Sequence, residues 1–552
     1  MEASMNDDKG APVISLRNLT IPLPPGGDRP HAVQDISYDV RAGEILCIVG
    51  ESGSGKSMSA NAIMGLLPDY LKPTAGEIIF RGQDLLTLPE ATLEGMRGKD
   101  MAMIFQEPLS ALNPLMTVGK QVAEVMLVHG GHTDAQRRQR VLELFRFVDL
   151  PDPDALYDTY PFRLSGGQRQ RVTIAMALAL EPSLLIADEP TTALDVTTQA
   201  QILALIARIQ KEKGMGVMFI THDFGVVAEI AHRVAVMEKG MLVEQGSAEQ
   251  VLNHPAHPYT RRLIAAVPHL NYGRKDAADR AAPLLAVRNL KKHYVLRGGW
   301  MGSKRVVRAV DDVSFSVRRG ETLGIVGESG SGKSTIGKCL LKLVGVDGGQ
   351  LLFDGRDIAP LSERQFRPMR HHIQMIFQDP FASLNPRHTV GRIISDGPVA
   401  NGIPRADAEA RCRALLEMVG LDPAVFNRYP HQFSGGQRQR VGIARALALD
   451  PQVLVADESV SALDVSVQAQ VLDLLQSLQE QLQIAMIFIT HDLRVAAQVC
   501  SHIAVMHRGK VVEHGAPNQI FEAPQSDYTR KLIAAVPGKA WKPPTLSDSG
   551  IQ

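Results

Sequence analysis

The sequence lacks the features that mark secreted, disulfide-stabilised or membrane-spanning chains. Its cysteines stand singly with no CxxC spacing, at Cys47, Cys339, Cys412 and Cys500. This scatter argues against a disulfide framework or a zinc site and fits a reducing cytoplasm. No run of apolar residues approaches the ~18–20 that cross a bilayer, and the first ten residues, MEASMNDDKG, are polar and acidic, unlike a secretory signal. If the protein works at a membrane, other subunits must supply the membrane part.

The chain also lacks an excess of charge of either sign. Lys+Arg and Asp+Glu number 59 each in 552 residues, so the net charge is zero. A balanced surface has no broad positive field to attract nucleic acid or anionic lipid, and we predict no nucleic-acid partner. Hydrophobic residues make up 45% of the chain, as in ordinary globular proteins, and the length indicates more than one domain.

The chain repeats itself once. GESGSGKS occurs at 50–57 and 327–334, SGGQRQRV at 165–172 and 434–441, and PYTRRLIAAVP at 258–268 returns as DYTRKLIAAVP at 527–537. A repeat of this length indicates two similar domains. We predict a first domain over 1–268, a polar linker over 269–282, a second domain over 283–537 and a loose tail over 538–552.

Each half reads as an α/β domain. EILCIVG (44–50) and ETLGIVG (321–327) are apolar runs that end in a Gly-rich turn before a helix-forming stretch. LLIADE, VLVADE, GVMFITHD and AMIFITHD are further continuous apolar runs, as in central parallel strands covered on both faces. Apolar residues at helical spacing separate them. This alternation predicts a mainly parallel sheet in each half.

The Gly-rich turns match G-x-x-x-x-G-K-[ST], a pattern whose glycines let backbone N–H groups surround phosphates. Lys56 and Lys333 are predicted to bridge the β- and γ-phosphates of ATP, and Ser57 and Ser334 to ligate Mg²⁺. The predicted ATP-binding residues of the two turns are Gly50, Glu51, Ser52, Gly53, Ser54, Gly55, Lys56 and Ser57, and Gly327, Glu328, Ser329, Gly330, Ser331, Gly332, Lys333, Ser334 and Thr335.

Two later strands end in a pair of acidic residues, at the strand tips where α/β folds hold ligands. We predict that Asp188 and Asp457 hold Mg²⁺ through its water shell. The adjacent Glu189 and Glu458 are predicted to orient and polarise the attacking water, a role that contributes about 10²–10⁴ in rate.

LSGGQRQRV (164–172) and FSGGQRQRV (433–441), just upstream of the acidic strands, resemble the signature of ABC ATPases. The resemblance covers nearly the whole chain. It implies two tandem P-loop NTPase cassettes, each with a mainly parallel core, an antiparallel β part and a helical subdomain. It also implies that the cassettes pair head to tail around two ATP molecules, with γ-phosphate contacts from Ser165, Gly166, Gly167 and Gln168 and from Ser434, Gly435, Gly436 and Gln437.

The same resemblance gives roles to residues outside these motifs. Gln106 and Gln378 match the Q-loop, which contacts Mg²⁺ and the attacking water, and His222 and His491 match the catalytic switch histidine. Tyr294 matches the aromatic residue that stacks on adenine, but its counterpart in the first half is Leu23. The halves differ at other positions as well, such as Pro190 opposite Ser459. We therefore predict two competent sites, with unequal affinities as one outcome.

The paired YTR-x-LIAAVP endings resemble the extension of oligopeptide, dipeptide and nickel importer ATPases. This implies an ATPase, peripheral on the cytoplasmic side of the inner (plasma) membrane, that serves two permease subunits and an extracytoplasmic solute-binding protein. Neither extension contains Cys, so no iron–sulfur cluster is predicted, and His254 and His257 are interpreted as loop residues rather than metal ligands. Alternatives are a tandem ABC ATPase of translation or DNA repair, a sugar importer, and cargo such as glutathione, peptide antibiotics, opines or nickel complexes.

Overall fold

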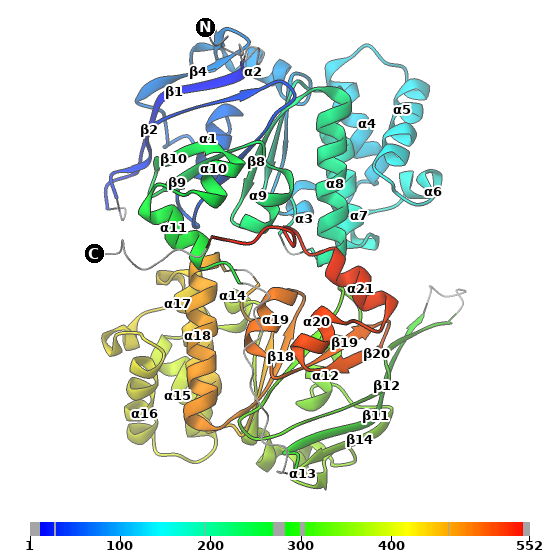
Figure 1. Ribbon diagram of the computed structural model, residues 1–552, viewed down its shortest axis with the longest axis vertical. Helices are drawn as coiled ribbons and strands as arrows, with labels where there is room; N and C mark the ends of the chain where they lie inside the picture. Colours follow the sequence, from blue (N-terminus) through cyan, green and yellow to red (C-terminus); the bar gives the residue numbers. More distant parts are fainter. Residues whose placement is uncertain are drawn as a thin grey trace, which may run out of the picture. The chain divides into compact units, whose positions relative to one another are not determined.

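The computed structural model describes residues 12–26, 29–192, 194–268, 282–297, 304–461 and 463–544. The chain divides into two units (Figure 1). The first comprises Met1–Leu194, Thr198–Val267 and Pro537–Gln552, and the second comprises Asp195–Thr197 and Pro268–Val536. Apart from residue 282, the predicted linker lies outside the described residues, as do residues 545–552 of the predicted tail. The described start of that tail belongs to the first unit, where Trp541 Nε1 donates a hydrogen bond to Asn253 Oδ1 (3.0 Å).

The first unit contains two sheets. The antiparallel sheet has the order β2-β1-β4-β5 and the larger sheet the order β10-β9-β3-β8-β7-β6, parallel except for β10. The strands of the first sheet are β1 (Pro12–Pro22), β2 (His31–Arg41), β4 (Ala75–Phe80) and β5 (Gln83–Asp84). Those of the second are β3 (Ile45–Val49), β6 (Met101–Ile104), β7 (Leu184–Asp188), β8 (Gly216–Thr221), β9 (Arg233–Glu238) and β10 (Met241–Ser247).

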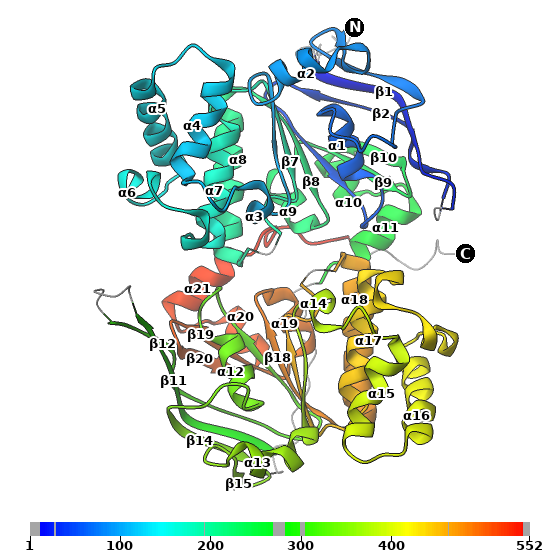
Figure 2. The same cartoon turned by 180° about the vertical axis from the view of Figure 1, so that it is seen from behind.

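Helices cover the larger sheet and also form a separate group, with α4 packed on α5, α6 and α7 (Figure 2). The helices are α1 (Lys56–Ile63), α2 (Glu90–Met96), α3 (Pro108–Ala111), α4 (Val118–His129), α5 (Asp134–Phe147), α6 (Pro153–Tyr157), α7 (Gly166–Ala177), α8 (Val196–Lys213), α9 (Phe224–Ile230), α10 (Ala248–Asn253) and α11 (Pro258–Ala265). Short 3₁₀ turns lie at Leu85–Thr87 and Pro161–Arg163. The helical group is the subdomain that the resemblance implied.

The second unit repeats this plan, with sheets in the orders β12-β11-β14-β15 and β16-β17-β18-β13-β19-β20. Its strands are β11 (Leu285–Arg297), β12 (Lys304–Val317), β13 (Thr322–Val326), β14 (Gly348–Phe353), β15 (Arg356–Asp357), β16 (Ile373–Ile376), β17 (Val453–Asp457), β18 (Ala485–Thr490), β19 (His502–His507) and β20 (Lys510–Gly515). Its helices are α12 (Lys333–Leu340), α13 (Glu363–Phe366), α14 (Pro380–Ser383), α15 (Val390–Ala400), α16 (Arg405–Met418), α17 (Gly435–Leu447), α18 (Val465–Leu482), α19 (Leu493–Val499), α20 (Pro517–Glu522) and α21 (Asp527–Ala534), with 3₁₀ turns at Arg367–His372, Pro423–Asn427 and Pro430–Gln432.

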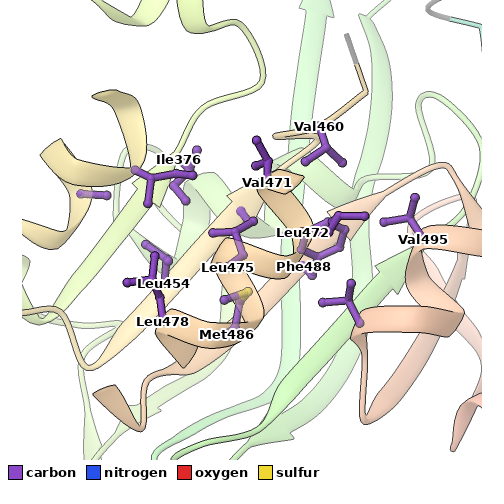
Figure 3. Packing of buried hydrophobic residues seen from close by; sticks show 14 of the residues in the cluster. Ile376, Leu454, Val460, Val471, Leu472, Leu475, Leu478, Met486, Phe488 and Val495 are labelled. Atoms are coloured by element: carbon purple, nitrogen blue, oxygen red, sulfur yellow. The ribbon is translucent and has the colours of Figure 1, made fainter. Parts of the chain in front are cut away.

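The central strands are buried along their whole length, as their apolar sequences predicted. Every residue of β3, β7 and β8, and of β13, β17 and β18, is buried. In the second unit, the apolar face of α18 packs against the sheet. Figure 3 shows Leu472 and Leu475 of α18 close to Phe488 and Met486 of β18. Both faces of the sheet are therefore buried, and its parallel strands end at the same edge. The predicted α/β class is confirmed.

No helix in the described part of the chain is long and apolar enough to cross a membrane.

Candidate functional site

In each unit, a Gly-rich turn connects a buried strand to the helix behind it. Gly50 follows β3 and Gly55 precedes α1, with φ of 152° and 103°. A Cβ at Gly50 would lie 2.2 Å from the carbonyl oxygen of Met237, and one at Gly55 would lie 2.7 Å from that of Ala32. Glycine is therefore required at both positions for the turn to pack so tightly. The turn between β13 and α12 repeats this geometry.

The turn lysines are folded onto the turn itself. Lys56 Nζ donates to the carbonyl oxygens of Gly50 and Glu51 at 2.7 Å each, and Lys333 makes the same two contacts in its own turn at 2.7 and 2.9 Å. Both lysines are buried, and burial lowers the pKa of Lys333 although nearby carboxylates oppose the shift. The ammonium groups are thus held at the mouth of each turn by carbonyls that a phosphate oxygen can replace.

Two serines in these turns have buried hydroxyl groups without a hydrogen-bond partner in the described structure, Ser54 and Ser331. An unpaired buried hydroxyl costs about 1–3 kcal/mol. Such a cost is accepted where a ligand supplies the missing partner. Together with the buried lysine and the backbone cradle, these hydroxyls fit the phosphates of a nucleotide.

A hydroxyl and a carboxylate meet behind each turn. Ser57 Oγ donates to Asp188 Oδ1, and Ser334 Oγ donates to Asp457 Oδ1, both at 3.0 Å. Burial raises the pKa of each aspartate above its ordinary value, although the serine hydrogen bond lowers it in part. Burial thus favours the protonated, neutral form of each aspartate. A bound cation would stabilise the ionised form instead. Hydroxyl and carboxylate oxygens are the ligands that hard divalent cations such as Mg²⁺ prefer.

Glu189 has three side-chain partners. Gln106 Nε2 and Thr192 Oγ1 both donate to its Oε2, at 3.0 and 2.9 Å, and His222 Nδ1 lies 3.2 Å from its Oε1. Burial by itself would raise the pKa of Glu189, but the hydrogen bond and charge of His222, with Thr192 and Lys56, outweigh it and lower the pKa to about 2. The carboxylate is therefore ionised at neutral pH.

The backbone of this glutamate is strained. Glu189 has φ of 45°, in the left-handed region that side chains other than glycine rarely adopt, and its N–H donates to the carbonyl of Ile220 (3.0 Å). Glu458 has the same φ and the same bond, to Ile489 (2.8 Å). Such strain costs about 1–3 kcal/mol and gathers at functional sites. It turns the carboxylate from the end of the strand towards the glutamine and histidine.

Glu458 repeats the arrangement with one contact fewer. Gln378 Nε2 donates to its Oε2 (2.7 Å), and His491 Nδ1 lies 3.5 Å from the same oxygen. Ser461, the counterpart of Thr192, donates instead to the backbone carbonyl of Glu458 (3.0 Å). The pKa of Glu458 is still lowered, because the histidine outweighs burial. The sequence interpretation overlooked Thr192 and Ser461, although the change from DEPTT to DESVS marked the difference.

The SGGQ motifs form helix starts. Ser165 caps α7, since its Oγ accepts the N–H of Gln168 (3.2 Å) while Gln168 Oε1 accepts the N–H of Ser165 (3.0 Å). Ser434 and Gln437 make the same capping box on α17. The two glycines that follow each serine therefore occupy the first helical turn, where backbone N–H groups are free of helical partners and favour an anion.

Tyr294 and Leu23 lie in different settings. Tyr294 is half-buried in β11, where it pairs with Val307 of β12 and has Lys292 Nζ 5.5 Å from its ring centre. Leu23 follows the end of β1 and packs partly buried against the core of the first unit. The first unit therefore has an aliphatic side chain where the second offers an aromatic ring.

The sequence motifs assigned no role to the paired tyrosines of the YTR endings. The Tyr259 hydroxyl accepts a hydrogen bond from the N–H of Glu51, and the Tyr528 hydroxyl accepts one from the N–H of Glu328, both at 3.1 Å. The only signal was the repetition of the motif. His257 caps α11, since its Nδ1 accepts the N–H of Tyr259 (3.3 Å).

Comparison with known proteins agrees with this geometry. The family described as "ABC transporter" matches residues 33–192 and 310–461, and "Oligopeptide/dipeptide transporter, C-terminal region" matches residues 243–292 and 512–546. The chain is 47% identical to "Peptidoglycan transport ATP-binding protein YejF" of Agrobacterium fabrum, over 96% of this chain and 97% of that protein. It is 48% identical to "Glutathione import ATP-binding protein GsiA" of Escherichia coli, over 95% of this chain and 89% of that protein.

A solved structure described as "Dimeric structure of a post-hydrolysis state of the ATP-binding cassette MJ0796 bound to ADP and Pi" is 31% identical, with a TM-score of 0.39. It covers 43% of this chain, and 98% of that chain is covered in return.

Proposed function

The chain belongs to the ABC transporter family and is an ATP-hydrolysing subunit of an ABC importer, and we propose that it drives uptake of peptides or peptide-like solutes through two separate permease subunits. An extracytoplasmic solute-binding protein would deliver the cargo, and this chain would be held peripherally on the cytoplasmic side of the inner membrane by the permeases. The observation that supports this best is that each unit has a lysine in the Gly-rich turn, a serine–aspartate pair and a glutamate with its glutamine and histidine partners. The oligopeptide/dipeptide region matches the end of both units.

Within each unit we assign the residues as follows. Lys56 and Lys333 leave their loop carbonyls to contact the β- and γ-phosphates. Mg²⁺, which neutralises phosphate charge when bound, would be held by residues with oxygen donors, namely Ser57, Gln106 and Asp188 in one unit and Ser334, Gln378 and Asp457 in the other. Glu189 and Glu458 accept the proton of the attacking water. Gln106 and His222 already contact Glu189, so they orient this base.

We further propose that the SGGQ helix starts act across the pair of units. The first-turn N–H groups after Ser165 and Ser434 suit a γ-phosphate bound to the other unit's Gly-rich turn. Because both units share one chain, this pairing would occur at high effective concentration. ATP binding would close the pair and hydrolysis would reopen it, which moves the permeases.

The permeases would contact the helical group next to each Q-loop. In the first unit, Leu109 and Leu115 follow Gln106 and are 57% and 86% exposed, which is unusual for leucine. In the second unit, the counterpart of Leu115 is Arg387. The counterpart of Leu109 is the apolar Phe381, so the change from apolar to cationic is confined to the Leu115 position. This difference suits two different permease subunits rather than two copies of one.

The chemistry is tested by replacing Glu189, Glu458 or both with Gln. The amide keeps the size of the side chain and one acceptor oxygen but cannot act as a base. The double variant should still bind ATP while hydrolysis falls by about 10²-fold or more. Each single variant should retain turnover at the other site. Full hydrolysis in the double variant would show that neither glutamate is the base.

The cargo is tested by deletion of the gene. Loss of uptake of labelled tripeptides, restored by the wild-type gene and not by the double Gln variant, would support a peptide importer. If peptide uptake persists and uptake of glutathione or of a peptidoglycan-derived peptide is lost instead, the cargo class changes. Unchanged uptake of all three would contradict the proposal.

A further inference from the structure

The C-terminal extension of each unit reaches the Gly-rich turn of the same unit through one hydroxyl group. Tyr259 stands in the first turn of α11 and is buried, and Tyr528 stands in the first turn of α21 (Figure 1). The hydrogen bonds from the N–H of Glu51 and of Glu328 to these hydroxyls span 208 and 200 residues of sequence. The same contact is therefore made twice, although the sequence between its partners differs in length.

These hydrogen bonds act on one particular peptide group. The N–H of Glu51 and the carbonyl of Gly50 belong to the same amide, and that carbonyl accepts the hydrogen bond of Lys56 Nζ (2.7 Å). The amide is thus held at its N–H end by the tyrosine and at its oxygen end by the lysine. The amide between Gly327 and Glu328 is held in the same way by Tyr528 and Lys333. When the lysine turns to a phosphate, the tyrosine hydroxyl still holds this peptide plane.

The tyrosines are themselves positioned by a glutamate in the preceding strand. Glu244 of β10 accepts the N–H groups of Ala256 and His257 (2.7 and 3.0 Å), just before α11. Glu513 of β20 accepts the N–H groups of Gln525 and Ser526 (2.7 and 3.1 Å), just before α21. Both helices are thereby fixed to the sheet at their N-terminal ends, next to the tyrosine.

The ring surroundings differ between the units while the hydrogen bond is the same. The guanidinium of Arg262 lies 5.7 Å from the centre of the Tyr259 ring, and His507 stacks on the Tyr528 ring at 4.0 Å. Burial raises the pKa of Tyr528 to about 12, so its hydroxyl is neutral at physiological pH. A contact that keeps its geometry while its packing neighbours change indicates a role for the hydroxyl itself.

We propose that Tyr259 and Tyr528 are positioning residues for ATP binding, through which each C-terminal extension holds the phosphate-binding turn of its own unit in the shape that accepts the phosphates. The hydroxyl does not touch the nucleotide. It removes the rotation of the first peptide of the turn, so that less ordering is left to occur when ATP binds. This role lies beyond the transport function and rests only on ATP binding at the Gly-rich turns.

The test uses the purified full chain with Tyr259→Phe, Tyr528→Phe and both. Phenylalanine keeps the ring and removes only the hydroxyl. Loss of a hydrogen bond that is worth about 1 kcal/mol net predicts a rise of about 3–10-fold in the Kd for the fluorescent nucleotide mant-ATP and in the KM for ATP. At saturating ATP, kcat should stay within about twofold. Tyr70→Phe, at an exposed tyrosine, is the matched control and should change neither constant.

Hydrogen exchange of the turns gives a readout that does not require hydrolysis. Faster exchange is expected in the peptide that contains residues 50–57 in Tyr259→Phe, and in the one that contains 327–334 in Tyr528→Phe, each confined to its own unit. The proposal fails if nucleotide affinity is unchanged, whether or not exchange rises, because the hydroxyl would then only pack the extension. It also fails if affinity falls without faster exchange, since the effect would then not pass through the turn.

Discussion

The second glycine of each SGGQ motif offers a test of packing at the helix start. A Cβ on Gly436 would lie 2.3 Å from Cγ1 of Val467, in the neighbouring helix α18. A Cβ on Gly435 would meet nothing nearer than Leu463 Cδ2 at 3.7 Å, an ordinary van der Waals distance. Alanine should therefore have opposite effects on stability at these two adjacent positions.

The magnitudes follow from two opposing terms. Alanine in place of a helical glycine stabilises by about 0.5–1 kcal/mol, and at Gly435 nothing opposes this gain. At Gly436 the valine must move, and because it is β-branched it has one preferred rotamer in a helix. Overpacking of this kind costs about 1–3 kcal/mol. Gly436→Ala should thus be destabilising by up to about 2.5 kcal/mol in total.

The assay is differential scanning calorimetry of the nucleotide-free chain, which can resolve separate transitions for the two units. Gly436→Ala should lower the Tm of the second unit by up to about 5 °C, while Gly435→Ala should raise it slightly. Val467→Ala opens space for the new methyl group. Gly436→Ala should therefore lower the Tm much less in the Val467→Ala chain than in the wild-type chain. Equal Tm values for the two alanine variants, or no rescue by Val467→Ala, would refute the steric argument.

Three further results are expected. Leu475→Ala, at a fully buried position of α18 (Figure 3), should be destabilising by about 2–5 kcal/mol in chemical denaturation, and a loss below about 1 kcal/mol would contradict the packing described. All four thiols are buried, and burial raises the pKa of three of them, so native protein should react slowly with DTNB at pH 8 while unfolded protein should react fully at Cys47, Cys339, Cys412 and Cys500. Burial opposes ionisation of Glu321, but His502 Nδ1, 3.0 Å from its Oε1, and the N–H of Arg318 lower its pKa overall. A lowered pKa contributes stability above the ordinary value near 4.3, and this stability is lost as the pH falls below about 5 towards the folded pKa. Glu321→Gln should therefore make the Tm of the second unit depend less on pH between about 5 and 3, and an unchanged slope would contradict this.

Most of the fold could be predicted because its central strands are buried on both faces. A strand such as β7 has no solvent side, so its sequence is a continuous apolar run that ends at the acidic pair. The antiparallel sheets had no such signal. β1 and β2 carry mixed burial patterns with several bulges, and their presence was implied by family resemblance rather than by periodicity.

The parts of the site that escaped prediction depend on tertiary contacts or on unusual backbone. Nothing in LLIADE says that Glu189 takes a positive φ, since glutamate rarely does so without support from its surroundings. The positive φ of Glu189 brings its carboxylate within hydrogen-bond distance of the Thr192 hydroxyl. The tyrosine of each extension could be seen to repeat, but the turn that it holds lies about 200 residues earlier in the chain, beyond any local pattern.

The duplication inside one chain provides an internal comparison that separates chemistry from packing. Some structural ion pairs differ between the units: Arg233 lies beside Glu44 in the first unit, and His502 lies beside Glu321 in the second. Several contacts at the Gly-rich turn, in contrast, agree between the units in residue and closely in distance. The serine–aspartate pair, the lysine on its carbonyls and the tyrosine on its amide all repeat within 0.2 Å.

By this criterion the tyrosine belongs with the phosphate-handling residues, and the contact of Thr192 does not, because Ser461 directs its hydroxyl to the backbone instead. The difference between the units therefore falls on the glutamate proposed to activate water and on the position proposed to stack on adenine, where Leu23 stands opposite Tyr294, while the contacts proposed to hold phosphate are the same. Unequal sites in this chain should accordingly differ in hydrolysis rate and in preference for the base, and should respond alike to removal of the tyrosine hydroxyl. If only one of the two Tyr→Phe variants weakened ATP binding, this distinction between phosphate contacts and the other contacts would be wrong.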